Sequence, residues 1–266
     1  MARPRYDLGS CRSGRVHRTE APLRLLLLDR YCAVIFAAEA RRCRDEQARP
    51  DTINEMHSPD IDRWRLIVPV KGQLAAKSRL DPPVGVVRAD LAHAFALDTI
   101  TAALACIPPA HLVVVTSDPL AAAFVRDKGG TVVADQGDGL NPAVRHGARY
   151  VEGVLGDGPT AVLLGDIPTL RSQDLVDALS ACARHPRAMV PDASGTGTVL
   201  LSALSPPDLH PHFGADSARK HTRHCVRLDL DLPALRTDVD DDQGLRRAIA
   251  LGVGRYTAAV LHLASG

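Results

Sequence analysis

Aromatic residues are scarce in this chain of 266 residues: four Phe, four Tyr and one Trp make up 3% of it. Ala, Val and Leu are abundant instead, and apolar residues reach 45% of the chain. A core of this composition favours helices and buried aliphatic strands over a β-sandwich. The length corresponds to one large domain, or to one domain with an appendage.

The chain also lacks an excess of either charge, because 32 Lys and Arg residues face 31 Asp and Glu residues. No long-range field therefore favours nucleic acid or an anionic membrane. No run reaches the roughly 20 apolar residues that a membrane helix needs, and charged residues interrupt the nearest one, residues 22–40. The n-, h- and c-regions of a signal peptide are not arranged in the required order either. We expect a cytoplasmic protein with neither a nucleic-acid nor a membrane partner.

Paired cysteine motifs are absent, since no two cysteines form a CxxC pair. The six cysteines are irregularly spaced: Cys11, Cys32, Cys43, Cys106, Cys182 and Cys225. This spacing argues against both a zinc site and a disulfide framework. Isolated thiols in a reducing compartment are predicted instead.

Residues 1–60 lack lysine altogether, although they contain many arginines. We treat them as an N-terminal extension and assign them no chemistry. The alternatives are a disordered tail, a small accessory helix, or a stretch translated from a wrongly assigned start codon. Met56 would then be the alternative start, five residues before the regular pattern begins.

From Ile61 onward, short apolar runs alternate with amphipathic segments. The runs predict strands at residues 66–70, 111–116, 131–134, 160–164, 188–191 and 198–203. The amphipathic segments predict helices at residues 88–104, 120–128, 141–152, 172–183 and 243–251, the last of the chain. This order predicts one α/β domain over residues 61–262, with a Rossmann-like fold. Its central sheet should be mostly parallel, with helices on both faces and ligands at the carboxyl ends of the strands.

A basic segment follows the first strand, at residues 71–80. It contains Lys71, Lys77 and Arg79, which suit the phosphates of a triphosphate and the charge of a departing pyrophosphate. It is not a Walker A motif, because the glycine spacing and the GK[ST] ending are missing. A solvated basic loop is the equally weighted alternative.

Carboxylates occur at two places suited to a divalent cation. Asp166 lies just past the strand at residues 160–164, and Mg²⁺ prefers hard oxygen ligands of this kind. Helix capping is the alternative role. In the segment TDVDDD, Asp238 and Asp240 alternate, so that a strand would place them on one face, near Asp166. Asp241 or Asp242 is expected to cap the helix that follows.

Two further segments are rich in small and polar residues. Residues 194–198, SGTGT, suit an anion, with a hairpin turn as the equal alternative. Residues 213–221, FGADSARKH, suggest a phosphate or carboxylate pocket at a helix start, with a capped basic helix as the alternative. His221 and His224 lack Cys or Glu partners, so a metal role for them is disfavoured.

Seven segments in a fixed order indicate a family: VPVKGQLAAKSRL, VVVTSD, LNPAV, LLGDIPTL, GTGT, FGADSARKH and TDVDDDQGL. Over about residues 65–255 the chain resembles the CofC/FbiD guanylyltransferases of coenzyme F-420 biosynthesis. The resemblance implies a nucleotidyltransferase fold, GTP and Mg²⁺, and transfer of GMP to a three-carbon phosphorylated acid. It also implies a downstream transferase that takes the product. The sequence leaves the oligomeric state open between a monomer and a homodimer.

The resemblance leaves the acid open. Phosphoenolpyruvate is preferred, because the Arg- and Ala-rich composition fits a GC-rich bacterium, and the product would be enolpyruvoyl-2-diphospho-5′-guanosine. The alternatives are 2-phospho-L-lactate and 3-phospho-D-glycerate, or a cytidylyl- or molybdopterin-type transferase. A non-catalytic nucleotide-binding regulatory module is the alternative of another class.

Motif matching to the family assigns roles to individual residues. Thr198, Gly214 and Ser217 match its acid-binding positions, and Asp166 and Asp238 match its metal-binding carboxylates. On the nucleotide side it implies contacts from Lys71, Lys77, Arg79, Ser117, Asp118 and Asn141. Lys71, Arg79 and Asp166 are the predicted catalytic residues. The sequence departs from the family at Asp81-Pro82-Pro83 and in its long N-terminal stretch.

Overall fold

The computed structural model describes residues 61–71 and 80–263. All the described residues belong to one compact unit, His57–Gly266. The predicted N-terminal extension, three of the six cysteines, and the site residues Lys77 and Arg79 lie outside the described residues. The domain bounds 61–262 stay a prediction.

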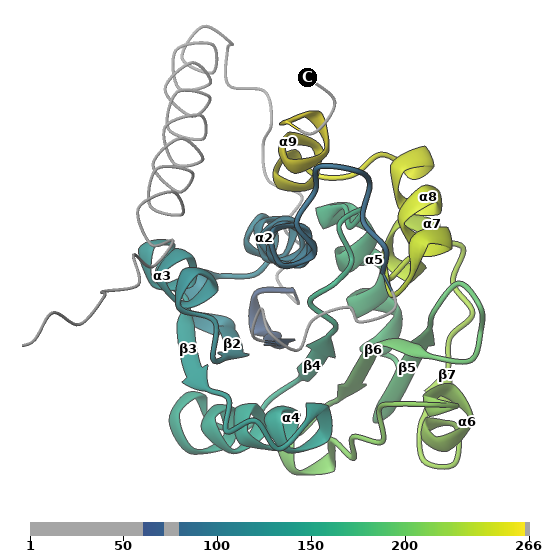
Figure 1. Ribbon diagram of the computed structural model, residues 1–266. Helices are drawn as coiled ribbons and strands as arrows, with labels where there is room; N and C mark the ends of the chain where they lie inside the picture. Colours follow the sequence, from purple (N-terminus) through teal and green to yellow (C-terminus); the bar gives the residue numbers. More distant parts are fainter. Residues whose placement is uncertain (1–60, 72–79, 264–266) are drawn as a thin grey trace, which may run out of the picture. The chain divides into compact units, whose positions relative to one another are not determined.

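A seven-stranded sheet with the order β3-β2-β1-β4-β6-β5-β7 forms the centre of the domain (Figure 1). The strands are β1 (Arg65–Val70), β2 (Leu112–Thr116), β3 (Thr131–Ala134), β4 (Thr160–Leu163), β5 (Arg187–Pro191), β6 (Thr198–Ala203) and β7 (Val226–Arg227). The four strands β3-β2-β1-β4 are parallel. Strand β6 is antiparallel to both of its neighbours, and β7 is parallel to β5. The predicted mostly parallel α/β sheet is confirmed.

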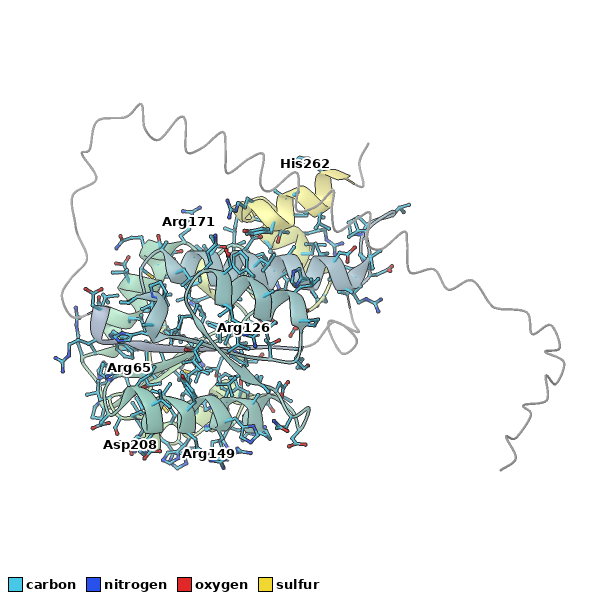
Figure 2. The ribbon with its side chains drawn as sticks, turned by 90° about the vertical axis from the view of Figure 1, so that its left-hand side faces the viewer. Arg65, Arg126, Arg149, Arg171, Asp208 and His262 are labelled. Carbon is cyan, nitrogen blue, oxygen red and sulfur yellow. The ribbon has the colours of Figure 1, made fainter. Side chains whose placement is uncertain are left out.

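Helices cover both faces of this sheet, as predicted. The helices are α2 (Arg88–Leu104), α3 (Pro119–Asp127), α4 (Leu140–Tyr150), α5 (Ser172–Cys182), α6 (Ser217–His221), α7 (Pro233–Arg236), α8 (Asp242–Leu251) and α9 (Arg255–Leu263). Helix α4 continues into a π-helical turn, Val151–Leu155. Helices α2, α3 and α5 cover one face, and α4 and α6 the other; in Figure 2, Arg171 and Arg149 mark the two sides.

Alternation along the strands produces a core on each face of the sheet. In β1, Leu66, Val68 and Val70 pack with α2, α3 and α5, while Ile67 packs with α4. Successive strand side chains point to opposite faces, so a strand buried on both sides must be apolar throughout. This requirement explains the continuous apolar runs in the sequence.

The C-terminal end of the domain differs from the sequence prediction in two ways. Residues 243–251 are not the last helix, because α9 follows and packs against α2. Asp98 of α2 accepts hydrogen bonds from the backbone N–H groups of Tyr256 (3.0 Å) and Thr257 (2.9 Å), the first turn of α9. The expected strand face with Asp238 and Asp240 is also wrong, because no strand includes residues 237–240; the short helix α7 ends at Arg236.

Candidate active site

The parallel half of the sheet reverses its strand order at β1, which lies between β2 and β4. Ligands of open α/β sheets bind in the crevice at such a point, outside the carboxyl ends of the strands. Lys71 follows β1 directly and is exposed, and Asp166 follows β4 by three residues. The structure therefore brings these two predicted residues to adjacent strand ends.

Gly165 lets the loop after β4 approach the end of β1 closely. A Cβ atom at this position would lie 2.9 Å from the carbonyl oxygen of Pro69 and 3.0 Å from a methyl group of Val70. Real Cβ atoms essentially never come so near a backbone oxygen. A glycine before Asp166 is therefore a packing requirement of the crevice.

Three hydrogen bonds from distant elements hold the loop at residues 165–170. The Thr99 hydroxyl of α2 accepts from the N–H of Ile167 at 3.1 Å, and Thr169 donates its hydroxyl to the carbonyl of Ala234 at 2.6 Å. The N–H of Gly254 donates to the carbonyl of Pro168 at 2.7 Å. These bonds fix the backbone directly after Asp166, which suits a residue that positions a charged reactant.

The acidic segment lies beside this loop. The N–H of Val239 donates to the carbonyl oxygen of Asp166 at 3.1 Å, which places Asp238 next to the Asp166 segment. Within residues 61–71 and 80–263, no three His, Cys, Asp or Glu side chains gather to form a metal site on their own. Two carboxylates nevertheless fit Mg²⁺, which usually takes one or two from the protein and completes its shell with water and substrate phosphates.

The described residues resume at Leu80, close to the same acidic segment. Leu80 is fully buried, and the N–H of Asp81 donates to the Asp242 carboxylate at 2.7 Å. Asp241 accepts from the N–H of Gly244 at 2.7 Å and caps α8, which confirms the predicted capping role. The basic segment therefore starts at Lys71, beside the Asp166 loop, and ends beside the start of α8.

The segment SGTGT forms the turn of the β5–β6 hairpin, in agreement with the hairpin alternative. Asp192 organises this turn: its carboxylate accepts from the N–H of Thr196 at 3.0 Å and from the Ser194 hydroxyl at 2.9 Å. The N–H of Gly195 donates to the Asp192 carbonyl at 3.0 Å. Two N–H groups of the turn are thus already used within the turn itself. The Thr198 side chain stays the candidate acid ligand that the family resemblance implies.

Helix α6 packs against this hairpin and brings the predicted acid-binding residues together. The N–H of Ala218 donates to the carbonyl of Thr196 at 3.0 Å, and the Ser217 hydroxyl donates to the Thr198 hydroxyl at 3.3 Å. Gly214 has a φ of +113°, which L side chains rarely adopt, and its carbonyl accepts from the N–H of Ser217 at 3.1 Å. Thr198, Gly214 and Ser217 therefore form one cluster.

Arg236 connects the hairpin to the acidic segment. Its guanidinium donates to the carbonyl oxygens of Pro191, Asp192 and Leu230 at 3.0–3.1 Å, and its own carbonyl accepts from the N–H of Ala193 at 2.7 Å. We had assigned no role to Arg236 or Asp192 from the sequence. Arg236 directly precedes the acidic segment, but nothing in its local pattern indicates bonds to carbonyls 44 and 45 positions away.

Comparisons with known proteins show the family to which the chain belongs. Residues 89–250 match the MobA-like NTP transferase domain. The phosphoenolpyruvate guanylyltransferase of Streptomyces coelicolor is 46% identical over 202 residues, which cover 74% of this chain and 95% of that protein. The enzyme of the same name from Streptomyces scabiei is 47% identical over 205 residues, with the same coverage. The chain belongs to the phosphoenolpyruvate guanylyltransferase family.

Among solved structures, the 4-diphosphocytidyl-2C-methyl-D-erythritol synthase of Anaerococcus prevotii is similar, with a TM-score of 0.45 and 10% identity. The match covers 72% of this chain and 96% of that one.

The nucleotide-side residues that the family resemblance implies occupy different environments. Ser117 is exposed at the end of β2. Asp118 is buried and caps α3, accepting from the N–H groups of Leu120 and Ala121. Burial of its carboxyl raises the pKa, but the adjacent His93 ring, whose Nδ1 lies 3.5 Å from the carboxylate, and the two N–H donors bring the net pKa below its usual value. Asp118 therefore stays ionised at neutral pH.

Asn141 binds the loop before α6. Its side-chain amide donates to the carbonyl of Phe213 at 3.1 Å and accepts from the N–H of the same residue at 2.7 Å. This pair of bonds fixes the backbone immediately before Gly214. Contacts of Ser117, Asp118 and Asn141 with the nucleotide stay predictions.

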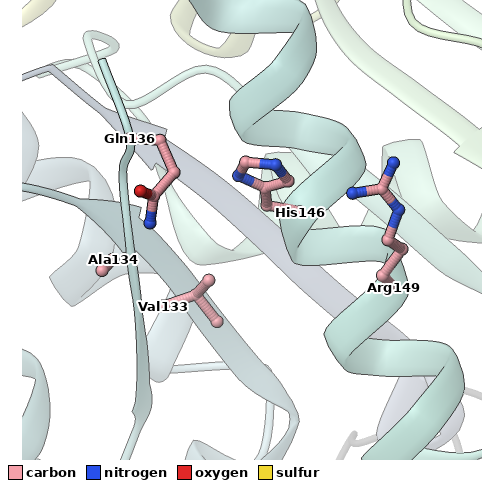
Figure 3. A pocket seen from close by; sticks show the side chains of 5 residues that line it. All are labelled: Val133, Ala134, Gln136, His146 and Arg149. Atoms are coloured by element: carbon pink, nitrogen blue, oxygen red, sulfur yellow. The ribbon is translucent and has the colours of Figure 1, made fainter. Parts of the chain in front are cut away.

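An open hollow of about 430 Å³ lies between the edge strand β3 and α4 (Figure 3). Val133 and Ala134 line it from the strand side, while His146 and Arg149 project from α4. Gln136, just after β3, adds an amide to the lining. None of the predicted site residues lines this hollow.

Cysteines contribute nothing to the site within the described residues. Cys106, Cys182 and Cys225 are free thiols, as predicted. Burial raises the pKa of Cys106 to about 12 and that of Cys182 to about 11, so both stay protonated.

No helix in the described ranges is long and apolar enough to cross a membrane.

Proposed function

We propose that this chain transfers GMP from GTP to phosphoenolpyruvate and releases pyrophosphate, in coenzyme F-420 biosynthesis. The observation that carries the proposal is the hydrogen bond from Val239 to Asp166, which joins two distant carboxylate-bearing segments at the crevice beside Lys71. The curated relatives, close to half identical to this chain, bear the name of this activity. The predicted cytoplasmic location, the oligomeric state and a downstream transferase belong to the same proposal.

The reaction needs no general base. An oxygen of the acid's phosphate group, already an anion, attacks the α-phosphorus of GTP. A new P–O bond forms there while the bond from the α-phosphorus to the bridging oxygen breaks, and that electron pair leaves with pyrophosphate. Catalysis therefore depends on positioning and on neutralising charge.

Each part of the crevice has a role in this proposal. Asp166 and Asp238 would hold Mg²⁺, which supplies charge neutralisation between the two anionic reactants. Lys71, with Lys77 and Arg79 of the basic segment, binds the triphosphate and stabilises the leaving group. Thr198, Gly214 and Ser217 hold the acid at the hairpin side.

The decisive experiment is incubation of the full chain with GTP, Mg²⁺ and one acid at a time. The three acids are phosphoenolpyruvate, 2-phospho-L-lactate and 3-phospho-D-glycerate, with pyrophosphate release and the mass of the guanylylated product as readouts. We expect release that depends on phosphoenolpyruvate, and the same mixture with CTP in place of GTP is the control. Preference for another acid would change the acceptor, and no release with any acid would favour the regulatory module.

A further inference from the structure

His221 is almost completely buried, at 1% exposure, and both of its ring nitrogens are engaged. The backbone N–H of His212 donates to Nε2 at 2.8 Å, and Nδ1 lies 2.9 Å from the Thr198 hydroxyl oxygen. A backbone N–H can only donate, so Nε2 must present its lone pair. A neutral imidazole carries one proton, which is therefore on Nδ1 and is donated to Thr198.

The His221 imidazole is neutral at neutral pH. Burial lowers the pKa of His221 to about 4, with smaller contributions from the nearby charges of His212 and Lys220. Its other close neighbour is the Phe213 ring, with centroids 5.1 Å apart. The tautomer deduced from the hydrogen bonds is thus the one present at neutral pH.

Thr198 consequently receives two hydrogen bonds at its hydroxyl oxygen. One comes from Nδ1 of His221 and the other from the Ser217 hydroxyl at 3.3 Å. A hydroxyl group has two acceptor positions and one proton. Since both acceptor positions are taken, the Thr198 proton must point to a third partner, as a donor to an anion would.

We propose that His221 is a positioning residue for the acceptor acid: it orients the Thr198 hydroxyl so that its proton is donated to the anionic substrate. This inference rests on the proposed function, which assigns Thr198 to the acid. Nothing in the mechanism requires His221 itself to touch the substrate or to gain or lose a proton.

The test compares KM for phosphoenolpyruvate in Thr198→Val, His221→Leu and the double variant. Thr198→Val removes the hydroxyl with little change of shape. Each single change should raise this KM roughly tenfold or more, the loss expected for a hydrogen bond to a charged group. KM for GTP should stay unchanged. The double variant should be no worse than Thr198→Val, because His221 acts only through that hydroxyl.

A merely structural role would give a different pattern. If the two effects on KM for the acid multiply, or if KM for GTP rises equally, the inference about His221 is wrong while the acid site stands. If Thr198→Val leaves KM for the acid unchanged although the enzyme is active, the assignment of the acid site fails as well. Exposed His224, changed to Leu, is the matched control and should behave as the unmodified enzyme.

Two measurements keep the inference testable if His221→Leu does not fold. Asparagine places a nitrogen donor near the position of Nδ1, and glutamine places its amide near Nε2. We therefore expect a lower KM for the acid in His221→Asn than in His221→Gln, and the reverse order would overturn the proposal. Long-range ¹H–¹⁵N NMR of the unmodified enzyme should also show His221 protonated at Nδ1, and protonation at Nε2 would overturn it too.

Discussion

In the β3-β2-β1-β4 half of the sheet, the candidate site residues follow directly from the ends of strands, whereas in the β6-β5-β7 half they are held by hydrogen bonds of side chains. Lys71 and Asp166 belong to the first half, where the parallel strands and Gly165 bring their segments together and Thr99 and Thr169 add hydrogen bonds to the loop after β4. Thr198 and Ser217 belong to the second half, where Arg236 and His221 fix the surrounding segments.

The comparison teaches that, in the proposed reaction, the two reactants would be held by different physical means. In this proposal the metal and the triphosphate bind at the carboxyl ends of the parallel strands. The hairpin half depends on a few polar side chains, so single polar changes there should affect the acid more than the nucleotide.

The largest expected effect is the loss of turnover in Asp166→Asn. One carboxylate charge disappears from the metal site, and a loss of about 10²–10³ in kcat is expected for an electrostatic group of this kind. The fold should survive, because the bond to Val239 uses the backbone carbonyl of Asp166 rather than its carboxylate. Pyrophosphate release at saturating Mg²⁺ measures the effect.

Asp62→Asn is the control for this variant, because Asp62 is exposed and precedes β1 at the opposite end of the strand. Near-normal turnover of Asp166→Asn would show that Asp166 is not a metal ligand. The division of roles between the two halves of the sheet would then be wrong as well.

Arg236→Met should destabilise the hairpin half. Three carbonyl oxygens lose their guanidinium donors, which we expect to lower the free energy of unfolding by about 1–3 kcal/mol. KM for the acid should rise more than KM for GTP, because the hairpin carries Thr198. Urea unfolding and steady-state kinetics measure the two effects, with exposed Arg223→Met as the control. An equal rise of both KM values would contradict the division of roles.

Gly147→Ala should destabilise the parallel half through packing alone. The new Cβ would lie 2.7 Å from a methyl group of Ile67 and 3.0 Å from one of Val115, so α4 must shift away from the sheet. Overpacking of this kind costs about 1–2 kcal/mol in the free energy of unfolding. Gly153→Ala is the matched control, because nothing lies within 4 Å of its Cβ. Equal stability of the two variants would show that the α4 contact is not tight.

The smallest effect near neutral pH concerns His221. Its pKa is about 4 in the native state, against 6.5 for an unperturbed His, so between these values the unfolded chain binds a proton that the native protein does not. The contribution to stability is therefore fully present above about pH 6.5 and is lost as pH falls toward 4. Urea unfolding measures the free energy of unfolding of the unmodified protein and of His221→Asn. The difference between the two should shrink as pH falls from about 7 to about 5. A constant difference would mean that the ring titrates normally.

Local patterns predicted elements in both halves of the sheet. The strand at residues 131–134 and the one at 198–203 match the structure, because each is a short β-branched and aliphatic run between turn residues. Asp241 caps α8 as predicted, since capping involves only neighbouring residues. The hairpin at residues 194–198 was one of two open alternatives, and its internal hydrogen bonds to Asp192 explain why the turn forms.

The errors lie where distant segments meet. The alternation in TDVD suggested a strand, but the segment makes its bond to the Asp166 loop rather than to a strand of the sheet. Helix α9 was missed because its start is capped by Asp98, 158 positions before Tyr256. His221 was judged only as a weak metal ligand, since its contact with Thr198 spans 23 positions.

The sequence by itself determined the α/β class, the order of strands and helices, and the residue types that suit a triphosphate, a cation and an acid. These depend on periodicity and on neighbours in the chain, which a single sequence displays. Only the tertiary structure decided that Arg236 binds the hairpin, that Gly165 lets the Asp166 loop approach β1, and which ring nitrogen of His221 carries the proton. Each of these depends on distances between atoms that are far apart in sequence, and such distances exist only once the two halves of the sheet have packed.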